Sequence, residues 1–182
     1  MNRFSEDRES SCCFSGHRAL TPQEMEKAAL KITELLPGFI AEGITHFYAG
    51  GALGFDLAAS VTVVNHKQTY PGIKLTLALP CRNHMVRWRR IDAELFRRVI
   101  SRADEVVYVS EEYSRGCMQL RNRYMVDRSS VCICWLAAES GGTFNTVSYA
   151  KKQGIKVLNL SSGYNGEQMG FDFNGKTPGR NF

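Results

Sequence analysis

The sequence predicts an α/β protein with a Rossmann-like, doubly wound and mostly parallel sheet that carries helices on both faces. Two observations support this class. Short, strongly apolar segments alternate along the chain with longer segments whose apolar residues recur at helical spacing. Two glycine-rich turns, at residues 50–54 and 140–143, each follow an apolar strand and precede a helix. Parallel sheets that bind ligands at the carboxyl ends of their strands use this arrangement.

Length and composition fit one globular domain. The chain has 182 residues, of which 43% are apolar and 23% charged, so it is long enough to bury a core. We expect a flexible segment at 1–10, one domain at 11–160 and an irregular tail at 161–182. No apolar run reaches the length of a membrane span, and the N-terminus is too polar for a signal peptide. A cytoplasmic protein without membrane attachment is therefore expected.

The predicted strands are apolar and bounded by turn residues, at 11–15, 45–49, 73–79, 105–110, 131–136 and 156–160. The first long helix starts at Thr21, which can cap it, with proline next and Glu24 completing a capping box. Its apolar face is interrupted at Pro37 and Gly38, before Phe39 and Ile40, and we expect Gly43 to close the element. The order of the strands does not follow from this pattern.

The cysteines predict buried thiols rather than a metal site or a disulfide framework. Cys81 and Cys117 fall near predicted loops, where partial exposure is open. The other four lie in apolar strands, where a free thiol behaves as a small hydrophobe. These are Cys12, Cys13, Cys132 and Cys134. Their spacing is not that of a CxxC pair, and no second cluster has metal-ligand spacing.

Arginines cluster along a helix that is predicted to begin at Asn83. Its apolar residues, among them Trp88, Ile91 and Leu95, are spaced to bury one side. The formal net charge of +5 is compatible with anionic ligands or nucleic acid. The cluster is either a solvated helix face or a surface for single-stranded nucleic acid. Its members are Arg82, Arg87, Arg89, Arg90, Arg97, Arg98 and Arg102.

The stretch HFYAGGALGFD, at residues 46–56, reads as a buried strand, a glycine turn and a helix start. Gly50, Gly51 and Gly54 would let the backbone approach a ligand closely, and the helix start offers free N–H groups. The same glycines also suit a purely structural turn. Asp56 either caps the helix or holds a ligand hydroxyl.

Other polar residues are predicted at the same edge of the sheet. His17 and Arg18 follow the first strand, so they can meet a phosphate or ribose, or merely cap neighbouring groups. Arg121 and Asn122 begin a helix and can bind phosphate and ribose, or carry a surface ion pair. The second glycine turn, at 140–143, has its helix start on this rim too, so the two turns together predict a two-part phosphate site.

Five motifs together resemble the YpsA-like family of the SLOG superfamily, which also includes DprA and the LOG phosphoribohydrolases. They are CCFSGHR (12–18), YAGGALGFD (48–56), LALPC (77–81), RNRYMVD (121–127) and SGGTFNTVSYA (140–150). The resemblance implies a Rossmann-like sheet and a nucleotide or nucleotide-derived ligand, such as AMP, ADP-ribose or NAD. The candidate ligand-binding residues are then Gly16, His17, Arg18, Gly50, Gly51, Gly54, Asp56, Pro80, Arg121, Asn122, Ser140, Gly141, Gly142, Thr143 and Thr146.

One position departs from the LOG pattern. LOG-type enzymes carry a glutamate three residues after the threonine of the second glycine motif, and here that position is Thr146. A carboxylate that could stabilise an oxocarbenium-like centre is therefore missing there. We expect a ligand-binding or sensor module, with no catalytic residue assigned, no certain cofactor and no metal.

Two alternatives and one further question stay open. The first alternative is a nucleotide N-glycosidase or phosphoribohydrolase in which His17, Asp56 or Glu139 replaces the glutamate. The second is single-stranded nucleic-acid binding, by analogy with DprA. Formation of a homo-oligomer is also left open.

Overall fold

The computed structural model describes residues 8–161. The remaining parts of the predicted N-terminal segment and tail, 1–7 and 162–182, lie outside the described residues. The strands are β1 (Ser11–Gly16), β2 (His46–Ala49), β3 (Lys74–Leu79), β4 (Glu105–Tyr108), β5 (Val131–Trp135) and β6 (Lys156–Asn159). The helices are α2 (Pro22–Ala41), α3 (Phe55–His66), α4 (Arg90–Ile100), α5 (Cys117–Asp127) and α6 (Gly141–Lys152). No helix within 8–161 is long and apolar enough to cross a bilayer.

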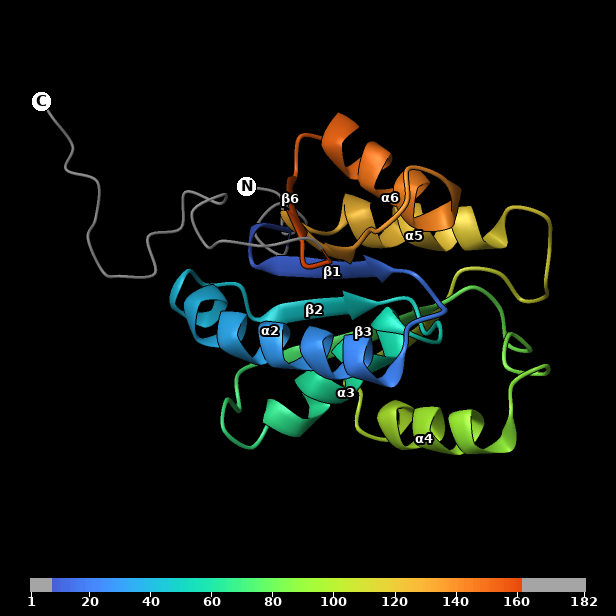
Figure 1. The fold of residues 1–182 in the computed structure, drawn as a ribbon, viewed down its shortest axis with the longest axis horizontal. Helices are drawn as coiled ribbons and strands as arrows, with labels where there is room; N and C mark the ends of the chain where they lie inside the picture. Colours follow the sequence, from blue (N-terminus) through green and yellow to red (C-terminus); the bar gives the residue numbers. More distant parts are fainter. Residues whose placement is uncertain (1–7, 162–182) are drawn as a thin grey trace, which may run out of the picture.

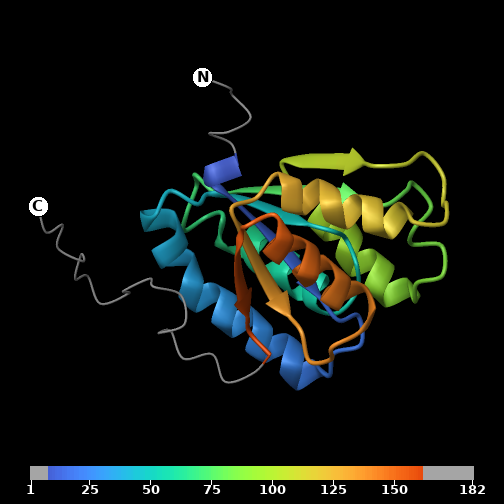
Figure 2. The ribbon, with the colours of Figure 1, turned by 90° about the horizontal axis from the view of Figure 1, so that it is seen from above.

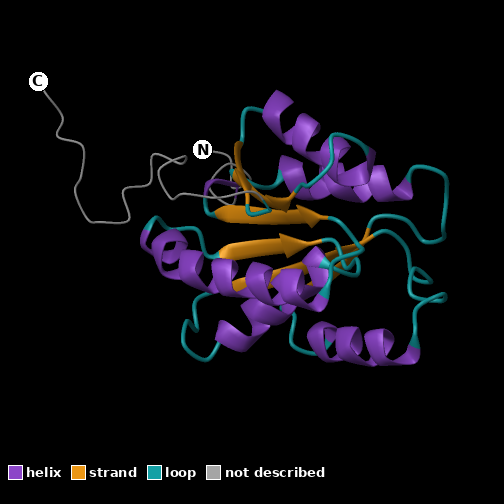
Figure 3. Cartoon of the chain, in the orientation of Figure 1, coloured by secondary structure: helices purple, strands orange, loops and turns teal. Residues whose placement is uncertain are grey.

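The six strands form one sheet in the order β4-β3-β2-β1-β5-β6, and every neighbouring pair is parallel. From β1 to β4 each strand adds to one side of the sheet, and β5 and β6 then add on the other side of β1. This reversal is the topological switch point of a doubly wound sheet. Figure 3 shows the strands between the two layers of helices. The predicted Rossmann-like α/β class is thereby confirmed.

Helices cover both faces of the sheet, as Figures 1 and 2 show. Helices α2, α3 and α4 lie on one face, while α5 and α6 pack side by side on the other. Strand residues alternate between the two layers, as the two-residue period of a strand requires. Phe14, Phe47 and Leu77 belong to the larger core beneath α2 and α3, whereas Cys13 and Tyr48 belong to the smaller core beneath α5 and α6.

Helix α2 continues through Pro37 to Ala41, and Gly43, which the sequence predicted to close this element, follows just beyond it with a φ of +82°. A proline inside a helix costs about 3 kcal/mol or more, since it removes one backbone hydrogen bond and crowds the preceding turn. Leu36 and Phe39, on either side of the proline, are almost fully buried. Their burial offsets the cost and holds the last turns of α2 on the sheet.

The predicted helix start at Asn83 is wrong, because α4 begins at Arg90 and residues 82–87 form turns. The Trp88 ring lies 5.3 Å from the Phe96 ring, between centroids, so the turns fold back on α4. Ile91 and Leu95 were expected to be buried, yet they are 70% and 39% exposed. Helical spacing identified an apolar face here, but the preceding turns, rather than a longer helix, cover part of it.

Candidate functional site

The switch point between β1 and β5 brings together the segments that follow these two strands. Gly16, the last residue of β1, pairs with Trp135, the last residue of β5. Immediately beyond them, the backbone N–H of Ala137 donates to Nε2 of His17 at 3.0 Å. His17 therefore fastens the loop between β5 and α6 to the end of β1, a role in which it accepts a backbone N–H.

An open pocket of about 200 Å³ lies at this switch point. It is lined by the end of β1, the start of α3, the start of α5 and the start of α6. Eight of the predicted site residues meet here: Gly16, His17, Arg18, Asp56, Arg121, Asn122, Gly142 and Thr143. Ligands of open α/β sheets bind in this position, outside the carboxyl ends of the strands at the switch point.

The first glycine turn is filled by the protein's own groups. The N–H of Gly50 donates to the Asp56 carboxylate at 3.1 Å, and its carbonyl accepts a hydrogen bond from Nη1 of Arg121. A side chain at Gly50 would overlap the Arg121 guanidinium. Gly54 has a φ of +71° and precedes α3, and a side chain there would meet the carbonyls of His17 and Arg18. The glycines of this turn thus permit close packing within the chain.

Asp56 lies in the first turn of α3 and forms a buried ion pair with Arg121. The Asp56 Oδ2 and Arg121 Nη1 atoms are 3.7 Å apart, and the two side chains are only 5% and 6% exposed. Burial raises the pKa of the Asp56 carboxyl and lowers the pKa of Arg121, while each charge opposes the shift of the other. Because Gly54 is the N-cap residue of α3, the interpretation of Asp56 as the cap is wrong.

The second glycine turn is open. Gly141 has a φ of +85°, and a Cβ added at Gly141 or Gly142 would meet no atom within 4 Å. Both residues are exposed, and they begin the 12-residue helix α6. The first N–H groups of a helix have no partner inside it and carry its positive dipole end. This turn therefore presents backbone donors to the pocket, whereas the first turn presents few.

A chain of hydrogen bonds joins α5 to the start of α6. Nδ2 of Asn122 donates to Oγ1 of Thr146 at 2.7 Å, and that hydroxyl donates to the carbonyl of Gly142 at 2.8 Å. Thr146 is only 3% exposed. Its hydroxyl thus holds the open turn in position and sets the orientation of Asn122.

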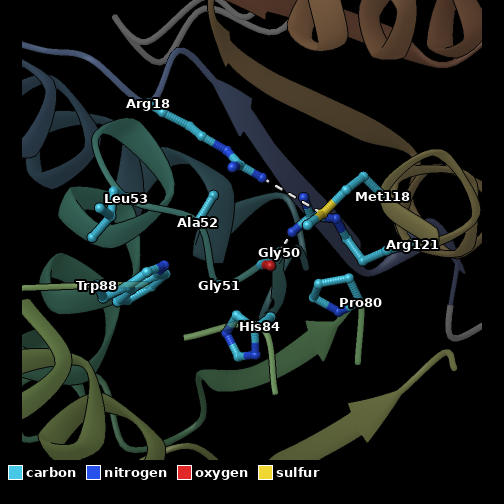
Figure 4. Close-up of a pocket in the computed structure, with 10 residues that line it drawn as sticks. All are labelled: Arg18, Gly50, Gly51, Ala52, Leu53, Pro80, His84, Trp88, Met118 and Arg121. Carbon is cyan, nitrogen blue, oxygen red and sulfur yellow. Dashed lines mark hydrogen bonds between the residues drawn. The ribbon is translucent and has the colours of Figure 1, made fainter. Parts of the chain in front are cut away.

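A second, smaller pocket of about 50 Å³ adjoins the first glycine turn, and Figure 4 shows its lining. Arg18 reaches across the turn, and its Nη2 lies 3.5 Å from the sulfur of Met118. Pro80 and His84 lie on the other side of Gly51. Burial is the main cause that lowers the pKa of the His84 imidazole. This pocket shares Arg18 and Arg121 with the larger one.

A third pocket, of about 210 Å³, lies between α5 and α6. Sequence reasoning identified Asn122, Gly142 and Thr146 of its lining but missed Gln119, Arg123, Asn145 and Tyr149. Helical spacing was the available signal. Residues 119, 122 and 123 share one face of α5, and residues 142, 145, 146 and 149 share one face of α6.

The remaining predicted residues take other positions. Gly50, Gly51 and Pro80 line the small pocket, and Thr146 lines the third. Gly54, Ser140 and Gly141 line none of these three pockets, although Ser140 is the N-cap residue of α6. Within residues 8–161, no group of three or more His, Cys, Asp or Glu side chains is arranged to hold a metal ion.

The parallel sheet, with its polar pocket at the switch point, defines a Rossmann-like α/β protein. Within that class, the YpsA family model, described as the YspA SLOG family, matches residues 21–174, and the chain belongs to this family. The uncharacterized SPbeta prophage-derived protein YoqJ of Bacillus subtilis (strain 168) is 34% identical over 140 residues, which are 68% of this chain and 82% of YoqJ. The UPF0398 protein BH1768 of Halalkalibacterium halodurans is 32% identical over 92 residues, about half of each chain.

Two solved structures of DNA processing protein A, DprA, have the same fold. DprA from Streptococcus pneumoniae matches with a TM-score of 0.62 and 19% identity, over 85% of this chain and 50% of DprA. DprA from Helicobacter pylori, whose structure concerns its single-stranded DNA binding mode, matches with a TM-score of 0.59 and 18% identity. That match covers 86% of this chain and 67% of DprA. The chain thus spans about half the length of the streptococcal DprA that it matches.

Proposed function

We propose that this protein binds a nucleotide or nucleotide-derived ligand, such as AMP, ADP-ribose or NAD, and acts as a ligand sensor. The phosphate of the ligand sits at the start of α6. The observation that carries this proposal is the open turn at Gly141 and Gly142, because Gly142 lines the same pocket as Arg18, Arg121 and Asn122. A helix start with two guanidinium groups nearby is a favourable environment for a phosphate.

Arg18 is the side chain best suited to contact the phosphate. Its side chain is exposed, and the hydrogen-bond partner of its Nη2 is the thioether of Met118, a weak acceptor. A phosphate oxygen is a much stronger acceptor, so Arg18 can exchange one partner for the other at little cost. Arg121, in contrast, is buried against Gly50 and Asp56, so it contributes positive charge to the wall of the pocket.

The arrangement supports binding rather than bond cleavage. Among the residues that line the three pockets, the one carboxylate is Asp56, in the pocket at the switch point. It already accepts a hydrogen bond from Gly50 and pairs with Arg121. The Thr146 hydroxyl already accepts a hydrogen bond from Asn122 and donates one to the carbonyl of Gly142. An N-glycosidase would need a carboxylate that is free to stabilise a ribosyl cation or activate water. Glu139 is exposed in the loop before α6 and lines none of these pockets.

Nucleic-acid binding has narrower support. The fold is that of DprA, and α4 with the turns before it is rich in arginine. Three of these arginines, however, form ion pairs: Arg82 with Glu111, Arg89 with Asp92, and Arg90 with Glu94. These pairs reduce the positive charge that a nucleic-acid backbone could neutralise.

Calorimetric titration of the full chain tests the proposal with AMP, ADP-ribose, NAD, ribose 5-phosphate and a short single-stranded oligonucleotide. At least one mononucleotide or dinucleotide is expected to bind. Arg18→Ala should weaken that binding about 10- to 100-fold, because a hydrogen bond to a charged group contributes roughly 1.5–3 kcal/mol. Arg98→Ala, which removes an exposed arginine of α4, is the matched control and should leave the affinity unchanged.

Gly142→Ala provides an independent check on the same titration. The added methyl group meets no atom of the described chain, so the variant should fold normally. It does place the methyl group beside the backbone donors at the start of α6, and phosphate binding should weaken. No binding across the whole panel would refute the proposal. If chromatography detects free base after the nucleotides are incubated with the protein, the N-glycosidase alternative replaces this proposal.

A further inference from the structure

The groove between α5 and α6 continues directly from the phosphate pocket. Asn122 and Gly142 line both the 200 Å³ pocket at the switch point and the 210 Å³ pocket between the helices. Thr146 joins them through its two hydrogen bonds, so this boundary has a defined geometry. A ligand with its phosphate at Gly142 therefore has one adjoining space of substantial size on the α5–α6 side of the pocket.

The size of the two adjoining pockets decides where the bulk of a ligand can go. A volume of roughly 10–15 Å³ of this kind holds one water molecule. The pocket beside Pro80 and His84, at about 50 Å³, has room for only a few waters. The groove between α5 and α6 is about four times larger, at about 210 Å³. A heterocyclic ring attached to the phosphate through a ribose fits the groove and not the small pocket.

The chemistry of the groove is dominated by carboxamides. Gln119 and Asn145 are exposed, with no hydrogen bond of their side chains to another residue in 8–161, and Asn122 lies between them and the phosphate pocket. The Arg123 guanidinium lies over the Tyr149 ring at 5.4 Å and forms another wall. The Tyr149 hydroxyl donates to Asp127 at 2.8 Å, so the ring is held in place.

Carboxamides have a specific complement among the nucleobases. Each offers a donor and an acceptor side by side, which matches the amino group and the adjacent ring nitrogen of adenine. Guanine presents two acceptors on the equivalent edge and pairs best with arginine or lysine there. The one arginine among the residues that line the groove, Arg123, has its guanidinium over the Tyr149 ring, whereas three carboxamides line the groove. No carboxylate lines the groove to accept from the donors on the other edge of guanine. The lining thus favours adenine over guanine.

We propose that the groove between α5 and α6 holds the adenine ring of an adenine nucleotide, with Gln119 and Asn145 binding its edge. This inference rests on the proposed function, because a phosphate bound at the start of α6 positions the attached ribose and base beside the groove. It assigns to the site a ligand class, adenine nucleotides, and two specificity-determining residues.

The test compares the affinities of AMP, GMP and ribose 5-phosphate for the full chain by calorimetry. The wild-type chain is expected to bind AMP at least tenfold more tightly than GMP or ribose 5-phosphate. Asn145→Ala and Gln119→Ala should each weaken AMP binding about tenfold, the size expected for loss of an amide contact to a base. Ribose 5-phosphate binding should stay unchanged in both variants. Gln68→Ala removes an exposed amide just beyond the far end of α3 and serves as the matched control.

The outcomes separate this inference from the function on which it depends. If ribose 5-phosphate and AMP bind equally well, or if both amide variants keep the wild-type affinity for AMP, the groove does not hold the base while the phosphate site stands. Tighter binding of GMP than of AMP would overturn the adenine assignment. If neither AMP nor ribose 5-phosphate binds the wild-type chain, the phosphate site and the groove fail together. Circular dichroism of each variant confirms that lost binding is not lost folding.

Discussion

Arg121 links the integrity of the fold to the charge of the candidate site. Its guanidinium donates a hydrogen bond to the carbonyl of Gly50, and its Nη1 atom lies 3.7 Å from Oδ2 of Asp56. The side chain is almost fully buried. Its Nε atom has no hydrogen-bond partner among the described residues. Burying both charges is unfavourable, which is why the pKa of Asp56 is raised although a cation lies beside it. Neither partner can therefore be removed without leaving the other charge buried and alone.

Arg121→Met should destabilise the fold by about 3–5 kcal/mol at neutral pH, because it leaves the Asp56 carboxylate buried without its partner. The pKa of Asp56 in the folded chain already lies above its ordinary value of 3.8, and loss of Arg121 raises it further. Ionisation of this carboxyl therefore destabilises the fold as the pH rises through that raised pKa, and protonation relieves the penalty as the pH falls. The deficit of the variant should therefore shrink as the pH falls from neutral towards the ordinary value of 3.8.

Urea unfolding at neutral pH and at an acidic pH measures this effect. Arg98→Met, an exposed arginine of α4, is the control and should change the free energy of unfolding by less than about 0.5 kcal/mol. The double change Asp56→Asn with Arg121→Met should recover part of the loss, since no charge then stays buried. An equal deficit at the two pH values would show that Asp56 ionisation is not its cause.

At the scale of the element, the two glycine turns share a sequence pattern but differ in what surrounds them. Strand, glycines and helix could be predicted for both, because each of these signals is local. The packing of Arg121 against Gly50 could not be predicted, since the two residues are 71 positions apart in the chain. The open space at Gly142 depends equally on where α5 lies. Local patterns thus identified the elements, while tertiary contacts distinguish a filled turn from an open one.

The same reasoning explains which helix boundaries could be predicted. The start of α2 was predicted correctly because Thr21 and Glu24 form a capping box through contacts only three residues apart. The start of α4 was not, because the turns before it are held by packing of His84 and Trp88 on Phe96. A helical spacing of apolar residues does not exclude such turns. The order of the strands likewise depends on long-range pairing and became visible only in the structure.

The capping box of α2 yields a prediction at this scale. Thr21→Ala should destabilise the fold by about 1 kcal/mol, because the N–H of Glu24 loses its acceptor. Hydrogen bonds from the backbone and side chain of Thr21 lower the pKa of Glu24. The ionised Glu24 thus contributes stability above its ordinary value of 4.5, and this contribution is lost as the pH falls through the lowered pKa. The difference between the two proteins should therefore narrow in acid.

Thermal unfolding at about pH 7 and pH 3 measures the change, with Thr69→Ala, in an exposed turn, as the control. A destabilisation of this size corresponds to a decrease in Tm of roughly 2–4 °C for a domain of this length. The capping role of Thr21 would be contradicted if Thr21→Ala and Thr69→Ala unfolded at the same temperature.

At the scale of the whole molecule, the sheet separates two cores of unequal size. The larger lies beneath α2, α3 and α4 and contains the buried phenylalanines, while the smaller lies beneath α5 and α6 and includes Cys13, Cys132 and Cys134. The candidate phosphate pocket opens at the carboxyl edge of the sheet, and its proposed base groove lies on the side of the smaller core. The sequence predicted this edge because parallel strands present their carboxyl ends together. The helices that flank this edge could be identified only from the strand order in the structure.

The reactivity of the six cysteines measures how often the fold opens, because every one of them is buried and none forms a disulfide. Desolvation raises the pKa of Cys12 and Cys81, and it raises that of Cys134 to about 12. Only a thiolate attacks a disulfide reagent, so a buried thiol with a raised pKa reacts when the fold opens. With a chromogenic disulfide at about pH 8, the native chain should release less than one equivalent within minutes, and six in urea. Arg121→Met should react faster than Arg98→Met, since it unfolds more often. Rapid release of one or more equivalents by the native wild-type chain would show that a core thiol is reachable without unfolding.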